Sequence, residues 1–543
     1  MPLARSWAKT MSDKTFDYVI IGAGSAGCTI ATNLIERRKG TVLLIEAGGH
    51  DKDLFIHMPG GLGKAIPRYT WPYAAEPSQD VKGRSIAVPQ GRVLGGSSSV
   101  NGMLYVRGHR NDYDRWETEF GCKGWGADEM LRYFAKAENN ESLTVPNHGN
   151  DGHLKVTEIR YRHPLSQAFV RAGQQMGLEY LTDYNGDRQE GVGFYQATIF
   201  NGERGSTAAT YLKAIRNHAE FKLEVDALVE RIEIEGGRAT GVTYRQGNRQ
   251  VTVHARAEVI LTAGAIGSPK ILQLSGIGPR SDLENAGVRV KHVLPVGENF
   301  HDHMHTSVNA SIKTPISLYG QDRGLRALKH GLQWMLFRSG LLTSPVLEGF
   351  AFVDTCNQGQ PDVQFHFLPV IDAFDDPFGV TEGRTHGITI KTGHLQPYSR
   401  GRVTIRSSNP ADLPRIDGRY LSDRRDVDGQ VRATKLALRM LQQPALAAHV
   451  DEVFSPTCIP DDTAAIEDWV RGAAKTVYHP VGTCRMGMEP ASSVVDTQLR
   501  VHGIAGLRVA DSSTMPSIPS GNTNAPTIAL AEKASDLISN ASR

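Results

Sequence analysis

A glycine-rich turn between two short apolar segments constrains the fold of this chain more than any other feature. Residues 16–21 (FDYVII) are a β-rich apolar run that predicts a buried strand. Residues 25–38 place apolar side chains on one face, as an amphipathic helix does, and residues 41–45 (TVLLI) predict a second strand. Together these segments predict one complete βαβ unit.

The turn itself has the spacing of a dinucleotide-binding loop. It contains Gly22, Gly24 and Gly27, and the acidic residue Glu46 stands 19 positions after Gly27. In such a loop the first glycine permits the tight turn, the second lets the backbone approach a pyrophosphate, and the third lets the helix pack on the strand. The helix N-terminus favours phosphate, and Glu46 would accept hydrogen bonds from ribose hydroxyls. The loop predicts a dinucleotide but does not choose between FAD and NAD.

Strand-like segments much further along the chain extend the same domain. Residues 258–264 end at a glycine, residues 507–510 end at Asp511, and a helix is predicted from about residue 527 to residue 539. A cofactor domain built from discontinuous segments follows from this order. Its expected parts are residues 11–160, 205–301 and 471–543.

The intervening stretch predicts a different kind of sheet. Residues 362–367 (DVQFHF) and 401–405 (GRVTI) alternate in the way expected of an antiparallel sheet with one face covered. We expect residues 161–204 and 302–470 to form this second, substrate-binding domain. The predicted fold class is therefore α/β, with a Rossmann-type domain and a second domain of antiparallel sheet covered by helices.

Composition excludes several classes of protein. The chain has 60 basic and 58 acidic residues, a net charge of +2, which gives no reason to expect nucleic acid as a partner. Its five cysteines form no CxxC pair, so a reducing, cytoplasmic location is expected. No window approaches about 18 consecutive apolar residues, so no transmembrane segment is expected. Residues 1–10 lack the apolar core of a secretory signal, and we expect Met11 to be the natural start. The short basic run at residues 107–110 is expected in a surface loop.

Several further motifs occur in a fixed order along the chain. Residues 91–102 read GRVLGGSSSVNG, and residues 264–279 read GAIGSPKILQLSGIGP. Three more are residues 204–208 (RGSTA), 296–303 (VGENFHDH) and 399–403 (SRGRV). These motifs resemble the signatures of the glucose–methanol–choline (GMC) oxidoreductases, and the resemblance covers residues 16 to 538. Around Thr70 and residues 348–350 it is most similar to bacterial choline and sorbose dehydrogenases.

The resemblance implies a bound FAD. The residues that would contact or surround it are Gly22, Gly24, Ser25, Ala26, Gly27, Glu46, Ala47, Arg92, Gly95, Gly96, Ser99, Asn101, Gly102, Val229, Ala263, Gly264, Ala510, Asp511, Asn522, Pro526 and Thr527. Some family members attach FAD covalently through a histidine in the glycine-rich loop, where this chain has Val100. Because valine cannot form that bond, we predict that FAD is held non-covalently.

A histidine and an asparagine near the C-terminus are the candidate catalytic pair. His479 lies in YHPVGT, and Asn522 follows 43 residues later in SGNTNAP. Oxidation of an alcohol needs a base for the hydroxyl proton, and histidine suits that role because its ordinary pKa is near neutral. The resemblance places His479 and Asn522 opposite the flavin. Asn524 is the competing asparagine, and we assign it to loop or flavin contacts.

Other polar residues have both a functional and a structural interpretation. His301, His303 and His305 alternate as a strand would present them on one face, but the resemblance implies a turn without metal, so no metal site is predicted. Glu348 is a candidate partner for a cationic substrate group, and a purely structural role is an equal alternative. His366 is a candidate pocket residue, with core packing as its alternative.

The family resemblance implies oxidation of a primary, choline-like or sugar alcohol. Hydride would pass to the flavin, and the electrons would then pass to an acceptor other than NAD, such as a quinone or an artificial dye. Two alternatives stay open: an oxidase that uses O2 and releases H2O2, and a non-redox, lyase-type member of the same fold. Peripheral attachment to the inner membrane is also left open.

Overall fold

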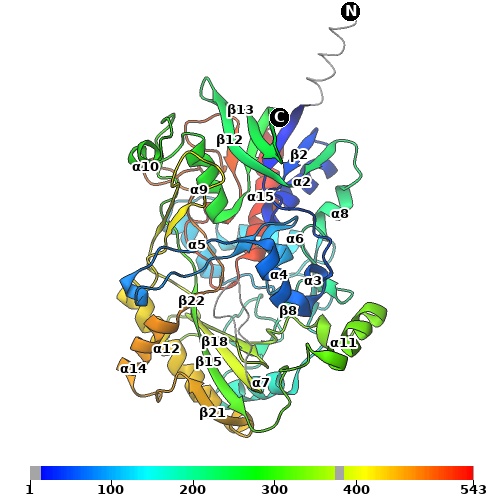
Figure 1. The fold of residues 1–543 in the computed structure, drawn as a ribbon, viewed down its shortest axis with the longest axis vertical. Helices are drawn as coiled ribbons and strands as arrows, with labels where there is room; N and C mark the ends of the chain where they lie inside the picture. The colour runs from blue at the N-terminus through cyan, green and yellow to red at the C-terminus, as the bar shows by residue number, and fades with distance from the viewer. Residues whose placement is uncertain (1–13, 373–384, 542–543) are drawn as a thin grey trace, which may run out of the picture.

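Two sheets of seven strands each organise the molecule, one toward each end of its long axis (Figure 1). The computed structural model describes residues 14–372 and 385–541. The expected start at Met11 lies outside these residues. Chain segments from the beginning, the middle and the end meet in the first sheet, as the discontinuous arrangement of its motifs predicts.

The first sheet contains the predicted βαβ unit. Its strands in spatial order are β11 (Phe221–Glu224), β2 (Val42–Ile45), β1 (Thr15–Ile21), β14 (Arg249–Leu261), β13 (Arg238–Gln246) and β12 (Ala227–Glu235), and β23 (Leu507–Val509) also pairs with β14. Strands β2, β11, β14 and β23 are joined in parallel around β1, whereas β12, β13 and β14 form an antiparallel meander. The predicted strands at both ends of the chain are confirmed.

Helices cover this sheet, and the glycine turn leads directly into one of them. They include α2 (Ser25–Glu36), α6 (Ala127–Ala137), α8 (Tyr211–Ile215), α9 (Gly264–Leu274) and α15 (Asn524–Ala541). Helix α15 packs against α2, so the two ends of the chain share one hydrophobic core. The helices predicted from residues 25 and 527 are confirmed, the second beginning three residues earlier than expected.

The second sheet is antiparallel, as predicted. Its order is β21 (Val450–Ser455), β15 (Met304–Ile312), β18 (Gly387–His394), β17 (Val363–Leu368), β16 (Gly349–Val353) and β7 (Gly191–Phe194), and β22 (Lys475–Thr476) also pairs with β15. Helices α7 (Pro164–Gln175), α12 (Arg424–Leu441) and α14 (Thr463–Ala473) share a hydrophobic core with it.

Alternation along β17 separates the two faces of this sheet. Val363, Phe365 and Phe367 belong to the core shared with the helices. Because successive side chains of a strand point to opposite faces, the intervening residues, among them His366, point away from the helices. The face that carries His366 is called the cavity face below.

Two local predictions are wrong. Residues 401–405 do form a strand, β19 (Arg402–Thr404), but it pairs only with β20 (Arg415–Asp417) and stands outside the large antiparallel sheet. Arg107 is not in a surface loop: it is 1% exposed and forms an ion pair with the buried Glu138. A single buried charge needs such a partner, and a basic sequence run does not reveal one.

No helix within residues 14–372 and 385–541 is both long enough and apolar enough to cross a bilayer.

Candidate functional site

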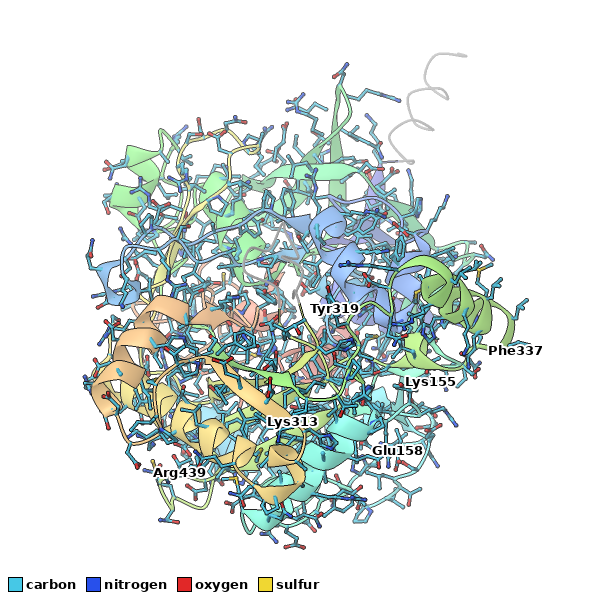
Figure 2. The ribbon with its side chains drawn as sticks, turned by 60° about the horizontal axis from the view of Figure 1, so that its bottom comes forward. Lys155, Glu158, Lys313, Tyr319, Phe337 and Arg439 are labelled. Carbon is cyan, nitrogen blue, oxygen red and sulfur yellow. The ribbon has the colours of Figure 1, made fainter. Side chains whose placement is uncertain are left out.

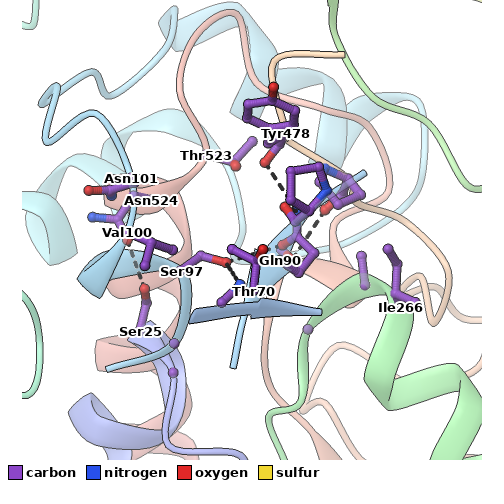
Figure 3. A pocket seen from close by; sticks show the side chains of 18 of the residues that line it. Ser25, Thr70, Gln90, Ser97, Val100, Asn101, Ile266, Tyr478, Thr523 and Asn524 are labelled. Atoms are coloured by element: carbon purple, nitrogen blue, oxygen red, sulfur yellow. Dashed lines mark hydrogen bonds between the residues drawn. The ribbon is translucent and has the colours of Figure 1, made fainter. Parts of the chain in front are cut away.

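A cavity extends from the glycine turn to the cavity face of the second sheet. Of the predicted FAD residues it is lined by Gly22, Gly24, Ser25, Ala26, Glu46, Ala47, Gly96, Asn101, Gly102, Val229, Ala263, Gly264, Asp511, Asn522 and Thr527. Figure 3 shows a close view of this region, in which Ser25, Val100 and Tyr478 surround one space. His479 and His366 line the same cavity.

Six of the predicted cofactor residues do not line the cavity: Gly27, Arg92, Gly95, Ser99, Ala510 and Pro526. The structure gives some of them supporting roles instead. A Cβ on Gly27 would lie 1.9 Å from the Gly22 carbonyl oxygen, so this position must lack a side chain for the helix to close on the turn. The backbone N–H of Gly95 donates to the Ala23 carbonyl at 2.8 Å, which ties the second glycine loop to the first.

The geometry of the glycine turn suits a pyrophosphate. Gly22 has a φ of +100°, which favours glycine. A Cβ on Gly24 would meet only the Gly96 Cα, at 3.8 Å, so the backbone here borders open space. Helix α2 begins at Ser25 with no side-chain cap. Its first N–H groups therefore have no side-chain acceptor and are suited to an anion.

Two buried carboxylates fix the walls of the dinucleotide end. Glu46 accepts hydrogen bonds from the backbone N–H groups of Ala23 at 2.9 Å and Gly48 at 2.8 Å, and burial raises its pKa to about 7. Asp511 accepts from the N–H of Gly264 at 2.8 Å and from the Ser268 hydroxyl at 2.6 Å. Because each carboxylate oxygen has two lone pairs, Glu46 can still accept from ribose hydroxyls.

The middle of the cavity is closed by polar contacts between distant segments. The Ser25 hydroxyl donates to the Asn524 side-chain oxygen at 2.7 Å, which holds the start of α15 against the start of α2 (Figure 3). Asn524 is thereby directed toward the glycine turn, in keeping with its assignment to loop contacts. Val100 lines the cavity and offers no heteroatom for a covalent link.

His479 and Asn522 are brought together at the far end, although they are 43 residues apart. The His479 Nε2 and the Asn522 Nδ2 lie 3.1 Å apart. The backbone on the N-terminal side of His479 is held by Asp302, which accepts from the His479 N–H at 2.8 Å. Asp302 also accepts from the hydroxyl of Thr476, at the end of β22. The second sheet thus positions this histidine.

Hydrogen bonds around His303 determine which ring nitrogen of His479 carries the proton. The Leu395 carbonyl, which can only accept, lies 2.9 Å from the His303 Nε2, so that nitrogen carries a proton. Burial lowers the pKa of His303 to about 4, so the ring is neutral and its Nδ1 has a lone pair that can only accept a hydrogen bond. That lone pair lies 3.2 Å from the His479 Nδ1, which must therefore be the donor. The remaining nitrogen of neutral His479, Nε2, is the basic one.

Asn522 completes this chain of contacts. The Gln364 side-chain N–H2 donates to the Asn522 Oδ1 at 3.4 Å, so the Asn522 N–H2 group faces the His479 Nε2. Burial lowers the pKa of His479 well below its ordinary value, and the neighbouring histidines, His303 first, lower it further. The histidine is therefore neutral and able to accept a proton.

The cavity face of the second sheet supplies further polar groups. His366 on β17 lines the cavity, and its Nδ1 lies 2.7 Å from the Tyr195 hydroxyl. His305 on β15 and Lys391 on β18 line it as well. Both ring nitrogens of His305 are buried without a hydrogen-bond partner. An unpaired buried polar group is costly, so His305 is suited to a polar group on a ligand.

Glu348 is not among the residues that line the cavity, which counts against its candidate contact with the substrate. It is fully buried, and its two oxygens accept from the Ser344 hydroxyl and from the backbone N–H of His163, both at 2.7 Å. Burial raises the pKa of this carboxyl. The structural interpretation, which the sequence left equally open, fits these contacts.

The three alternating histidines do not share one face. Strand β15 begins only at Met304, so the strand alternation does not govern His301 and His303. The His301 Nε2 accepts from the backbone N–H of Ile518 at 3.0 Å, away from the contacts of His303 and His305. Within the described residues, no three His, Cys, Asp or Glu side chains are grouped so as to hold a metal ion.

Sequence reasoning missed His303, His305 and Lys391 as parts of this site. A signal for Lys391 was present: residues 387–394 (GITIKTGH) alternate, and Ile388 and Ile390 belong to the core while Lys391 faces the cavity. The role of His303 depends on its contact with His479, which is 176 residues away. No local pattern could have indicated that pairing.

Comparison with known proteins identifies the family. The N-terminal GMC oxidoreductase profile matches residues 16–305, and the C-terminal profile matches residues 397–531. This chain belongs to the GMC oxidoreductase family. It is therefore an FAD-dependent oxidoreductase that acts on the CH–OH group of an alcohol, and the glycine turn and the open backbone at Gly24 fit that cofactor.

Individual relatives match almost the whole chain. An oxygen-dependent choline dehydrogenase of Vibrio vulnificus (strain YJ016) is 41% identical over 96% of this chain and 94% of its own length. An alcohol dehydrogenase [acceptor] of Pseudomonas putida is 39% identical over 96% and 95%. Among solved structures, pyridoxine 4-oxidase from Mesorbium loti is 30% identical with a TM-score of 0.86, covering 96% of this chain and 98% of that one. A formate oxidase variant of Aspergillus oryzae RIB40 is 26% identical with a TM-score of 0.91, covering 97% and 98%. The predicted GMC fold is confirmed.

Proposed function

We propose that His479 and Asn522 are the two side chains that contact the reacting alcohol. When bound, FAD supplies the acceptor for the α-hydrogen, which leaves as hydride. His479 takes the hydroxyl proton on Nε2, and the Asn522 amide orients the alcohol oxygen. The observation that carries this proposal is the hydrogen-bond chain from Leu395 through His303, which leaves the His479 Nε2 unprotonated beside Asn522.

Charge that develops on His479 is stabilised by groups already in place. As His479 becomes an imidazolium, its Nδ1–H becomes a stronger donor to His303, because charge-assisted hydrogen bonds are stronger than neutral ones. Asp302 accepts from the His479 backbone N–H and keeps the ring in position. Burial disfavours the imidazolium, so the proton must pass on to water or to the acceptor before the next cycle.

The cavity lining favours an alcohol with a second oxygen function over one with a quaternary ammonium. Lys391 lines the substrate end but forms an ion pair with the buried Asp372 at 3.1 Å, and Glu348, the carboxylate that could have paired with a cation, faces its own hydrogen-bond partners. The carboxylates among the described lining residues, Glu46 and Asp511, belong to the dinucleotide end. The unpartnered His305 nitrogens would bind a hydroxyl of the substrate. We therefore propose a polyol-like substrate whose second hydroxyl meets His305.

An anaerobic titration tests the reaction class. Purified protein with its flavin is mixed with a panel of alcohols, and bleaching of the visible spectrum is followed. We expect bleaching by at least one alcohol, and we expect His479→Ala to keep its flavin while bleaching falls by about 100-fold or more. His218→Ala, an exposed histidine, is the matched control. A His479→Ala protein that bleaches like the wild type would overturn the assignment of the base.

Admission of air then distinguishes the acceptors. A dehydrogenase stays bleached until a dye or quinone is added, whereas an oxidase recovers its colour within seconds. We propose the dehydrogenase, and the name of the Pseudomonas putida relative, which specifies an acceptor, supports this. Fast recovery in air would establish the oxidase instead.

Matched substrates test the substrate class. Choline and 3,3-dimethylbutan-1-ol have the same shape and differ only in charge. We expect the neutral alcohol to be the better substrate of the two and butane-1,4-diol to be better than butan-1-ol. His305→Leu should remove the preference for the diol, while His218→Leu, at an exposed histidine, should not. Preference for choline would refute the substrate class and leave the reaction class intact.

We further propose that the chain divides between the two cores, with residues 11–160, 205–301 and 471–543 holding FAD and residues 161–204 and 302–470 holding the substrate. The first hydrophobic cluster lies within the FAD-binding parts and supports this division. The second holds the antiparallel sheet and its helices but also includes apolar residues from 73–88, together with Ile266, Phe300 and Ala474. We also propose that the enzyme acts in the cytoplasm, because its five cysteines are all free.

A further inference from the structure

Helix α11 (Gly324–Phe337) presents large apolar side chains to solvent along one face. The exposed fractions are 83% for Leu325, 57% for Leu328, 46% for Leu332, 58% for Met335 and 69% for Leu336. Their spacing of three, four, three and one residues places all five on a single helical stripe. Monomeric soluble proteins seldom expose a continuous apolar surface of this kind, so the stripe is suited to a partner.

The fold itself turns this stripe outward. On the opposite side of the helix, Trp334 is completely buried, and its indole N–H donates to the Gly202 carbonyl at 2.7 Å. Arg338 lies over the Trp334 ring at 4.1 Å and pairs with Glu203 at 2.9 Å. Figure 2 shows Phe337 on this helix at the outer edge of the molecule. The helix is thus anchored along one side, and its leucine face cannot turn inward.

The charges of α11 point to a lipid surface. The helix carries Arg326 and Lys329 and contains no acidic residue from Gly324 to Phe337. On a helical wheel, Lys329 falls at the edge of the apolar stripe and Arg326 lies about 60° further round. One side of the stripe therefore carries a basic margin, as in an interfacial membrane helix. A second copy of the chain is a poorer partner, because in a symmetric contact neither copy of the helix offers an acidic residue to pair with Arg326 or Lys329 of the other.

We propose that α11 docks this enzyme on an anionic bilayer surface, lying in the plane of the interface with its leucines among the acyl chains. The next element, η4 (Leu341–Thr343), lies beside η1 (Pro59–Gly61), where a Cβ on Gly60 would be 3.0 Å from Leu342. Helix α4 (Leu62–Tyr69) follows directly, and its Leu62 and Ile66 line the cavity. The segment that follows the docked helix therefore contacts the segment that leads into the wall of the flavin site.

Vesicle binding tests this proposal with the full-length, flavin-loaded protein. Sedimentation is measured with vesicles of phosphatidylcholine containing phosphatidylglycerol and with pure phosphatidylcholine. We expect binding to the anionic vesicles that weakens in high salt. The double substitution Leu328→Glu/Leu332→Glu should reduce the partition coefficient by at least about tenfold, since it removes two inserted side chains and adds negative charge. Met488→Glu, at a side chain that is 62% exposed elsewhere, is the matched control.

Two further readouts separate docking from misfolding and from self-association. Alcohol oxidation with a water-soluble dye should be unchanged in the double variant, which shows that it is folded. Met335→Trp, at a stripe residue that is 58% exposed, should give an indole fluorescence that shifts to the blue on addition of anionic vesicles. Failure of the wild type to bind either kind of vesicle overturns the proposal. So does a dimer, measured by light scattering, that Leu328→Glu/Leu332→Glu converts to a monomer.

Discussion

Replacing His303 tests whether the proton arrangement of His479 is what makes it a base. In the structure, the His303 Nδ1 is the acceptor for the His479 Nδ1–H at 3.2 Å, and both rings are buried. His303→Leu removes that acceptor. His479 then either keeps a buried N–H without a partner, at about 1–3 kcal/mol, or moves its proton to Nε2, where it can no longer accept one from the alcohol.

Either outcome lowers the rate of the chemical step. Since about 1.4 kcal/mol corresponds to a factor of ten, we expect kcat/KM to fall by about 10- to 100-fold. The loss should appear in the rate of anaerobic flavin reduction, measured by stopped flow, and not in the dissociation constant of the alcohol. His303→Asn, whose side-chain oxygen can take the place of Nδ1, should recover part of the rate. A His303→Leu enzyme that reduces its flavin within about threefold of the wild type would refute this reasoning.

Three other perturbations have outcomes that the geometry fixes. Because burial lowers the pKa of His479, its neutral, active form persists below the ordinary histidine pKa of about 6.5. We therefore expect kcat/KM to fall with decreasing pH only below about pH 6.5. A pH profile in which kcat/KM already falls at or above the ordinary histidine pKa would contradict the assignment of His479 as the base. Gly27→Ala should abolish FAD retention, measured by absorbance of the purified protein, because its Cβ would lie 1.9 Å from a backbone oxygen. Gly331→Ala, where an added Cβ meets no atom within 4 Å, is the control, and retention of flavin by Gly27→Ala would disprove the packing argument. Glu348→Ala should lower the melting temperature, since it leaves buried donors unpaired at about 1–3 kcal/mol each. Glu348→Gln should keep kcat/KM for neutral alcohols. A selective loss of activity toward cationic alcohols in Glu348→Gln would show that this residue belongs to the substrate site.

Local patterns predicted much of the fold. The glycine turn lies between a strand and a helix that the sequence bounds well, so β1, α2 and β2 appear within a few residues of their expected limits. The strand near residue 365 was equally predictable from its alternation. The strand at residues 402–404 was also predicted, but its place outside the large sheet was not, because alternation does not specify which strand is the neighbour.

The site was predictable only where one residue carries its own motif. His479 and Asn522 stand in recognisable segments. The role of His303 comes from its contact with the distant His479, whereas His305 and Lys391 reach the cavity through strands of the second sheet. Strands β15 and β18 pair so that His305 lies opposite Gly393. Strands β17 and β18 pair so that His366 lies opposite Lys391. One register shift would move each of these side chains to the helix-covered face. We therefore propose that substrate choice in this chain depends on the register of the second sheet, while the reaction depends on the loops that carry His479 and Asn522. On this proposal, substitutions on the cavity face change the alcohol without disturbing His479, and this separation would let one family oxidise different alcohols with the same pair of residues.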